Sequence, residues 1–142
     1  MIRQLTIEHV EELAHVLARR IMSWDEPIPD FGSRFPNILE SCLNTPFQTF
    51  AKKDLYPRLE DKAAILFYLL IKNHPFQNGN KRVAVTSLLV FLYINGRWLK
   101  TSPDEIYRLA VWVAESMPVT KDGVIRAIDD FIRHRAVKTE PG

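Results

Sequence analysis

Residues 74–84, HPFQNGNKRVA, contain a histidine, two asparagines, a glycine and a Lys-Arg pair. Two strongly apolar stretches flank them, AAILFYLLI at 63–71 and VAVTSLLVFLYI at 83–94. Such flanks are typical of two helices that are buried on most faces. The polar segment between them is therefore either a simple connection or a site that does chemistry.

The second half of this segment has the composition of an anion-binding helix start. If Asn78, Gly79 and Asn80 open the second helix, the first backbone N–H groups lack intrahelical partners and lie at the positive end of the helix dipole. Gly79 would allow phosphate to approach the backbone. Lys81 and Arg82 add positive charge in the same turn, and arginine can contact two phosphate oxygens. These residues favour a phosphate ligand.

His74 could supply a base, because a loop could return it to the rim of this site, five residues before Gly79. Imidazole accepts a proton near neutral pH, and a hydroxyl deprotonated beside a bound polyphosphate can attack phosphorus. The pattern indicates phosphoryl or nucleotidyl transfer. On spacing alone, an inert connection is an equally good interpretation, with Asn80 as a helix cap and the Lys-Arg pair in solvent.

The other candidate groups are weaker. His9 and His15 are six residues apart on one predicted helix and face different directions, so we interpret them as solvent or rim histidines and not as a metal pair. His134 is interpreted as a complement to the negative end of the last helix. Cys42 is interpreted as a small core residue.

Helical periodicity surrounds the motif. A first amphipathic helix is predicted from Thr6, as N-cap, to about residue 21, with the apolar face Ile7, Val10, Leu13, Ala14, Leu17 and Ile21. A short helix is predicted at 37–43, and 47–57 is predicted to be an exposed extended flap. The central helices follow at 59–73 and at about 80–94.

Two more helices are predicted after Gly96. Ser102, Pro103 and Glu105 predict an N-cap, a first helical residue and a capping box for a helix at 103–116. The last helix is expected to open at Asp122 or Gly123. Because strand signals are almost absent, we expect an all-α fold, a compact bundle of about six helices with a short flap before the central pair. Residues 1–137 are predicted to form one domain and 138–142 a flexible tail.

Bulk composition narrows the class of protein. With 142 residues, of which 46% are hydrophobic, the chain can form one ordinary domain. A formal charge of +2 is too small to predict a nucleic-acid partner. One cysteine excludes an intramolecular disulfide, and the apolar runs are shorter than the ~20 residues that span a bilayer. We expect a soluble, cytoplasmic protein with no membrane partner.

HPFQNGNKR resembles the signature of the Fic/Doc superfamily, which reads His, any residue, Phe, any residue, Asp or Glu, Gly or Ala, Asn, Gly or Lys, Arg. The stretches FAKKDLYPRLEDKAAILFYLLIKN and VTSLLVFLYINGRWL, on either side, also resemble the death-on-curing branch of that family. Members of this branch are toxins of certain toxin–antitoxin pairs. The resemblance covers roughly residues 1–130 and implies the Fic/Doc helical fold.

The resemblance also implies roles for single residues. His74 would be the general base that activates a target hydroxyl, and Phe76 would anchor the loop in the core. The nucleotide phosphates would be bound by the helix start, with Asn80 and Arg82 in the family's phosphate-binding positions. The flap residues would hold the target segment by strand addition, namely Thr49, Phe50, Ala51 and Lys52.

Two positions bear on the reaction that the family relationship implies. In the branch that transfers AMP, a second glycine follows the motif asparagine and another arginine comes three residues after the first, whereas this chain has Lys81 and Val85. Death-on-curing toxins carry the lysine and are described as protein kinases. The resemblance therefore implies that ATP phosphorylates a Thr or Ser of a bacterial protein. Elongation factor Tu is the target known for that branch, and adenylylation is the alternative.

Asn78 departs from the family, because an acidic residue that helps to hold Mg²⁺ stands at this position in the motif. Carboxylates bind this hard cation better than a neutral amide does, although Mg²⁺ also relies on phosphates and water. We expect weakened Mg²⁺ binding. Reduced activity, an inactive relative that acts as a binding module, and another acidic donor such as Asp54 all remain open.

Many family members carry an inhibitory helix whose glutamate blocks productive nucleotide binding. The nearest match in this chain is Thr101 to Glu105, but a capping box explains these residues better than an inhibitory helix does. We therefore expect an antitoxin protein to inhibit in trans.

Overall fold

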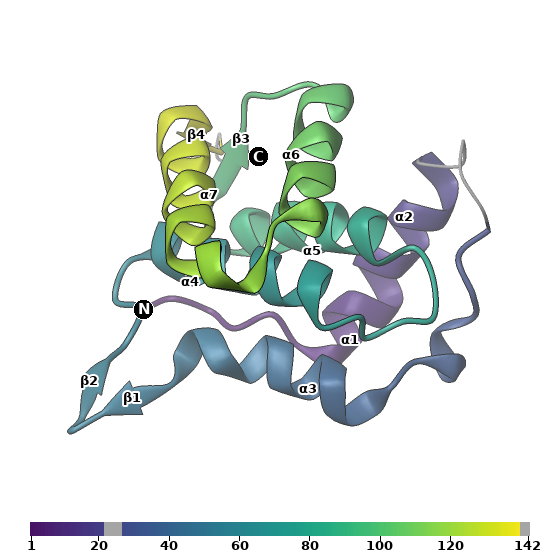
Figure 1. Ribbon diagram of the computed structural model, residues 1–142, viewed down its shortest axis with the longest axis horizontal. Helices are drawn as coiled ribbons and strands as arrows, with labels where there is room; N and C mark the ends of the chain where they lie inside the picture. Colours follow the sequence, from purple (N-terminus) through teal and green to yellow (C-terminus); the bar gives the residue numbers. More distant parts are fainter. Residues whose placement is uncertain (22–26, 140–142) are drawn as a thin grey trace.

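The computed structural model of the protein describes residues 1–21 and 27–139 and is mostly helical, as predicted. Two central helices, α4 (Leu59–Lys72) and α5 (Asn80–Ile94), pack against each other and are surrounded by the remaining helices (Figure 1). Nearly every residue of α4 from Lys62 onward is buried, and α5 is buried over most of its length. The prediction of two core helices on either side of the polar segment is confirmed.

The first helix is interrupted by a π-helical turn, which the sequence analysis did not predict. It runs as α1 (Ile7–His9), a π turn (Val10–Ala14) and α2 (His15–Ile21), and Thr6 caps it as expected. A π turn adds a residue to the helical turn and so rotates everything after it. The buried residues of this helix are Val10, Ala14, His15 and Ala18.

The predicted apolar face of this helix is wrong in part. Leu13 and Leu17 are 46% and 39% exposed. With Tyr93, Trp98 and other apolar residues of α5, β3 and α6 they line an open groove of about 450 Å³. The π turn is accompanied by a tertiary hydrogen bond, because the Thr86 hydroxyl of α5 donates to the carbonyl oxygen of Ala14 (2.7 Å).

A helix and a hairpin precede the central pair. The helix predicted at 37–43 is present as α3 (Pro36–Asn44), with 3₁₀ turns before and after it (Phe31–Ser33 and Thr45–Phe47). The predicted flap is an exposed two-stranded hairpin of β1 (Thr49–Phe50) and β2 (Lys53–Asp54). Its turn residues Ala51 and Lys52 both have positive φ, as a tight hairpin turn requires.

The C-terminal part contains α6 (Pro103–Glu115), a 3₁₀ turn (Pro118–Thr120) and α7 (Lys121–Arg135). It also contains a second two-stranded sheet that the sequence analysis missed, β3 (Arg97–Leu99) paired with β4 (Ala136–Lys138). Lys138, the first residue of the predicted tail, is the last residue of β4. The other residues of the predicted tail are Thr139, which the structure describes, and 140–142, which lie outside the described residues.

The predicted capping box of α6 is only half formed. The Ser102 hydroxyl accepts from the backbone N–H of Glu105 (3.0 Å), as a cap should. The Glu105 carboxylate instead accepts from Thr101 and from Arg135 at the end of α7. It therefore links α6 to α7.

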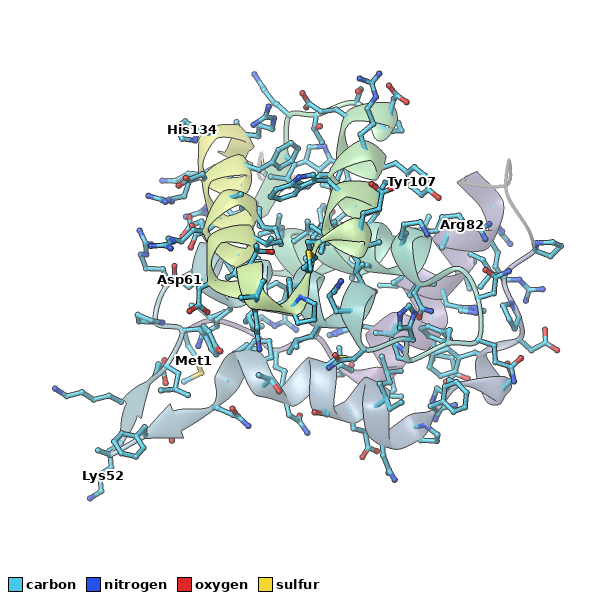
Figure 2. The ribbon with its side chains drawn as sticks, in the orientation of Figure 1. Met1, Lys52, Asp61, Arg82, Tyr107 and His134 are labelled. Atoms are coloured by element: carbon cyan, nitrogen blue, oxygen red, sulfur yellow. The ribbon has the colours of Figure 1, made fainter. Side chains whose placement is uncertain are left out.

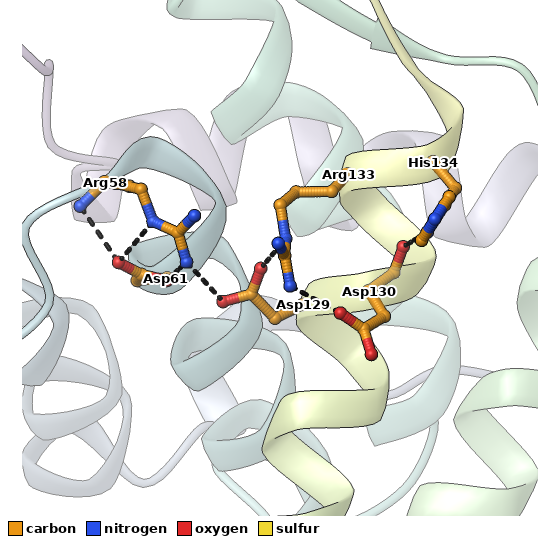
Figure 3. Close-up of polar contacts among 6 residues, drawn as sticks. All are labelled: Arg58, Asp61, Asp129, Asp130, Arg133 and His134. Atoms are coloured by element: carbon orange, nitrogen blue, oxygen red, sulfur yellow. Dashed lines mark hydrogen bonds and ion pairs between the residues drawn. The ribbon is translucent and has the colours of Figure 1, made fainter.

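A chain of ion pairs fixes α7 against the start of α4 (Figure 3). Arg58, which precedes α4, contacts Asp61 (2.9 Å) and approaches Asp129 of α7 (3.8 Å). Arg133 pairs with Asp129 (2.9 Å) and with Asp130.

Among residues 1–21 and 27–139, no helix has the length and hydrophobicity that crossing a bilayer requires.

Candidate functional site

His74 lies in the loop that joins α4 to α5, two residues beyond the end of α4. Its side chain is exposed, and its backbone φ of 52° lies in the left-handed region, which is unusual for a residue other than glycine. The ring Nδ1 is 3.3 Å from the side-chain nitrogen of Asn80, the first residue of α5. The structure thus brings the predicted base to the start of the predicted phosphate-binding helix.

The Asn80 side chain is held in one orientation by the backbone of Phe76. Its Oδ1 accepts from the Phe76 N–H (2.9 Å), and its Nδ2 donates to the Phe76 carbonyl (2.8 Å). Because an N–H only donates and a carbonyl only accepts, the amide cannot be flipped. Nδ2 must therefore donate to His74 Nδ1, and the proton of a neutral His74 ring lies on Nε2.

Phe76 is buried beneath the loop in a cluster of rings. Its centroid is 5.5 Å from that of His15 and 5.9 Å from that of Phe31. His15 was predicted to be a solvent or rim residue, and this is wrong, because it is 3% exposed and its Nε2 lies 2.9 Å from the Pro29 carbonyl. Burial lowers the pKa of its imidazole, so a neutral His15 donates to that carbonyl.

Gly79 immediately precedes α5 with φ 78°, a conformation that glycine adopts without strain. The Ile28 side chain lies against it, so that a Cβ at position 79 would be 2.7 Å from Ile28 Cγ1. The segment 27–31, which carries Ile28, Pro29 and Phe31, therefore covers one side of the motif loop. Sequence reasoning missed this segment, since only its prolines stood out.

The two cations of the first helical turn differ in environment. Lys81 is partly exposed, whereas Arg82 is buried at 2% exposure. Figure 2 places Arg82 and Lys52 on opposite sides of the view, the first near the start of α5 and the second at the hairpin tip. The positive charge available at the surface of the helix start is thus that of Lys81.

Asn78 does not present a ready cation site. Its Oδ1 accepts from the N–H of Gly79 (2.8 Å), and its Nδ2 lies 3.5 Å from the Pro27 carbonyl. In the described ranges 1–21 and 27–139, no three His, Cys, Asp or Glu side chains are grouped so that they could hold a metal ion. The donor set therefore does not fit Mg²⁺ without further ligands, and we assign no step to this ion.

The flap and the motif loop lie at opposite ends of α4 (Figure 1). Because α4 has 14 residues, its ends are about 21 Å apart. Thr49, Phe50, Ala51 and Lys52 are thus not in contact range of His74. Asp54, considered above as a substitute metal ligand, pairs with Lys62 (3.5 Å) at the far end of the same helix.

The remaining candidate residues have structural partners. His9 Nδ1 accepts from the Thr6 N–H (3.0 Å), and His134 Nδ1 lies 2.6 Å from the Asp130 carbonyl. Cys42 is buried as predicted, and burial raises the pKa of its thiol to about 11. A thiol with so high a pKa is a poor nucleophile at neutral pH.

Comparison with known proteins identifies a family and a relative. The model of the Fic/DOC family matches residues 4–92, which include the whole motif. The Toxin Doc of Mycolicibacterium smegmatis (strain ATCC 700084 / mc(2)155) is 44% identical over 77 residues, 54% of this chain and 55% of that protein. The match thus spans about half the length of this curated relative. No solved structure matches the chain. Because the family model covers more than half of the sequence, this chain belongs to the Fic/DOC family.

Proposed function

We propose that this protein is a toxin that transfers the terminal phosphoryl group of ATP to a Ser or Thr hydroxyl of another protein. The observation that carries the proposal is the contact between His74 and Asn80 at the first residue of α5. This contact supports the proposal because a group that can accept a proton lies beside a helix start that has Gly79 before it and Lys81 within its first turn. The relative named Toxin Doc supports the toxin assignment.

The reaction assigns a distinct role to each group. A ring nitrogen of His74 takes the proton of the target hydroxyl, the hydroxyl oxygen forms a bond to the γ-phosphorus, and ADP leaves. The phosphate oxygens would lie at the start of α5, where backbone N–H groups and Lys81 favour negative charge. Asn80 holds the loop and, before the substrates bind, the ring of His74.

The tautomer of His74 adds a requirement to this mechanism. In the neutral ring the lone pair lies on Nδ1, where Asn80 donates a hydrogen bond, and the outward Nε2 carries the proton. A hydroxyl can therefore lose its proton to this ring only if the contact with Asn80 opens or the ring turns. We propose that binding of the nucleotide and target separates the two side chains.

Phosphorylation is preferred to adenylylation because of Lys81. A lysine where AMP-transferring relatives have glycine places a bulky cation in the phosphate-binding turn, which favours a different orientation of the nucleotide. The test is incubation with α-labelled and γ-labelled ATP in the presence of elongation factor Tu. Label from the γ position alone, absent with His74→Ala, is expected. Label from the α position would indicate adenylylation instead.

A binding module without catalytic activity is the second candidate, and the engaged Asn78 amide favours it. The Asn78→Asp variant discriminates between a binding module and an active transferase. If the wild type transfers no label and Asn78→Asp does, the native protein is a binding module with an impaired site. If both transfer label at comparable rates, the amide is compatible with catalysis. An antitoxin that inhibits the protein in trans, and elongation factor Tu as target, belong to the same proposal.

A further inference from the structure

His15 is a buried imidazole that lies outside the motif, and no step of the proposed reaction uses it. It is the first residue of α2 and is 3% exposed. Its Nε2 lies 2.9 Å from the Pro29 carbonyl, and its ring centroid is 5.5 Å from that of Phe76. Burying a polar ring is costly unless it finds such partners. His15 therefore contacts two stretches of chain at once, the motif loop and the segment that covers it.

We call residues 27–35, which run along the motif loop, the cover segment. Near its start, the Ile28 side chain lies against Gly79. In its middle, the ring centroid of Phe31 is 5.9 Å from that of Phe76. The two stretches therefore run in opposite directions, because residue numbers rise along the cover segment where they fall along the loop.

The end of the cover segment is bonded next to the proposed base. The Phe35 N–H donates to the carbonyl of Pro75, the residue after His74 (2.9 Å). His74 has φ 52°, and a residue other than glycine stays in this left-handed region only where surrounding contacts hold it. The hydrogen bond from Phe35 is one such contact. The cover segment thus helps to hold the backbone from which the His74 ring projects.

His15 is itself fixed relative to α5. It follows the π turn, and the carbonyl of Ala14, the residue before it, accepts from the Thr86 hydroxyl of α5 (2.7 Å). Arg19 and Asp30 form a further contact between α2 and the cover segment (3.4 Å), but both side chains are exposed. Exposed ion pairs contribute little to stability. The hydrogen bond from the buried His15 is therefore the stronger attachment.

We propose that His15 is a positioning residue, which holds the cover segment on the motif loop and so fixes the backbone of His74. The bearing on the reaction rests on the proposed function. A role in filling space would need only the ring, because a phenyl group would pack against Phe76 equally well. The donor nitrogen distinguishes the two roles, and variants at position 15 can remove the nitrogen and the ring separately.

Amide exchange of Phe35 tests the positioning role without any need for activity. In His15→Phe, which keeps a ring and removes the donor, we expect this amide to exchange about five- to tenfold faster, the net effect of one hydrogen bond. His15→Gln keeps an N–H donor and removes the ring, so its Phe35 amide should exchange more slowly than that of His15→Phe. Urea should affect this exchange only weakly, as it does for a local opening and not for global unfolding.

Two controls separate the cover segment from the rest of the molecule. Asp30→Asn removes the exposed ion pair of the same segment and should change exchange at Phe35 by less than about twofold. The Lys100 amide, which donates to the Arg135 carbonyl beside the β3–β4 sheet, should keep its wild-type rate in all variants.

Three results would overturn the proposal. The first is unchanged exchange at Phe35 in His15→Phe. The second is exchange in His15→Gln that is as fast as in His15→Phe, because the ring and not the donor would then hold the segment. The third is equal acceleration at Phe35 and Lys100, which would indicate a general loss of stability.

A kinetic measurement connects the cover segment to the reaction. In the transfer assay, His15→Phe should lower kcat several-fold, because a displaced base reacts poorly. KM for ATP should stay unchanged, because Asn80 keeps its own bonds to the loop at the start of α5. A raised KM with unchanged kcat would contradict an effect through His74. If the wild type transfers no phosphate, the proposed function fails, whereas the exchange result still decides whether His15 holds the cover segment.

Discussion

At the scale of residues, the motif is held together by the side chain of Asn80. Its side-chain amide forms hydrogen bonds with both polar groups of the Phe76 backbone and with the ring of His74. These partners are four and six residues before it, so a single side chain closes the loop between the two core helices. The arrangement explains why an asparagine, with both a donor and an acceptor, stands at the first position of α5.

The tautomer of His74 can be measured directly. With ¹⁵N-labelled histidine, at a pH at which the rings are neutral, we expect the His74 proton on Nε2. In Asn80→Asp the side chain can only accept, so the proton should move to Nδ1. The same tautomer in both proteins would show that Asn80 does not control the ring. His134 is an internal reference, since its Nδ1 must donate to the Asp130 carbonyl.

Substitution of Gly79 tests how closely segment 27–31 approaches the motif. We expect Gly79→Ala to lower the free energy of unfolding by about 1–3 kcal/mol, through its positive φ and the contact with Ile28. Gly96→Ala is the matched control, because Gly96 has φ 75° but no atom near its added Cβ. Urea unfolding of both variants checks this. Equal losses of unfolding free energy in the two variants would mean that the Ile28 side chain moves aside without an energetic cost.

At the scale of elements, α7 contacts α4 through two neighbouring carboxyl groups, Asp61 of α4 and Asp129 of α7. The two groups are hydrogen-bonded to each other, so their pKa values differ. Partial burial raises the pKa of Asp61, but the hydrogen bonds from Arg58 outweigh it and bring the pKa to about 2. Partial burial, and then the hydrogen bond and charge of Asp61, raise the pKa of Asp129 to about 6. At pH 5 the pair therefore carries a proton, which lies on Asp129.

This pair predicts a dependence of stability on pH. A carboxyl group whose pKa rises from about 3.9 in the unfolded chain stabilises the fold fully below that value and loses the contribution as pH rises through about 6. Between pH 5 and pH 7, the free energy of unfolding should fall by roughly 1 kcal/mol from this source. The lowered pKa of Asp61 acts oppositely, but only as pH falls from about 3.9 toward 2.

Asp129→Asn isolates the effect, because the amide mimics the protonated carboxyl at every pH. Thermal unfolding at pH 5 and pH 7 should show a smaller decrease for Asp129→Asn than for the wild type. Groups that titrate elsewhere, such as histidines, contribute equally to both proteins and cancel in the comparison. A parallel pH dependence of the two proteins would refute the assignment to Asp129.

At the scale of the whole molecule, the parts that the sequence predicted are those that local interactions decide. The two core helices follow from continuous apolar stretches, and the caps at Thr6 and Ser102 depend on residues three positions away. Spacing alone left the motif open between an inert connection and a site, and its resemblance to the Fic/Doc signature decided between them. The contacts of Phe76 and His74 with Asn80 are local, across a short loop.

The parts that could not be predicted depend on distant contacts. The π turn in the first helix accompanies a bond between Ala14 and Thr86, and it decides which leucines are exposed. β3 and β4 are three residues each, too short for an alternating pattern, and they pair across about forty positions of sequence. Glu105 was assigned to a local cap because Arg135, its partner from α7, lies 30 residues away.

The measurement that most directly tests whether His74 and the start of α5 serve one nucleotide is an ATP titration of labelled protein by NMR. We predict that the ring signals of His74 and the backbone amides of Gly79 to Lys81 shift along a single binding curve. The amide of Leu55 in the distant hairpin should not shift on that curve. Shifts of the α5 amides without the His74 ring, or no shifts in the motif at all, would contradict the account.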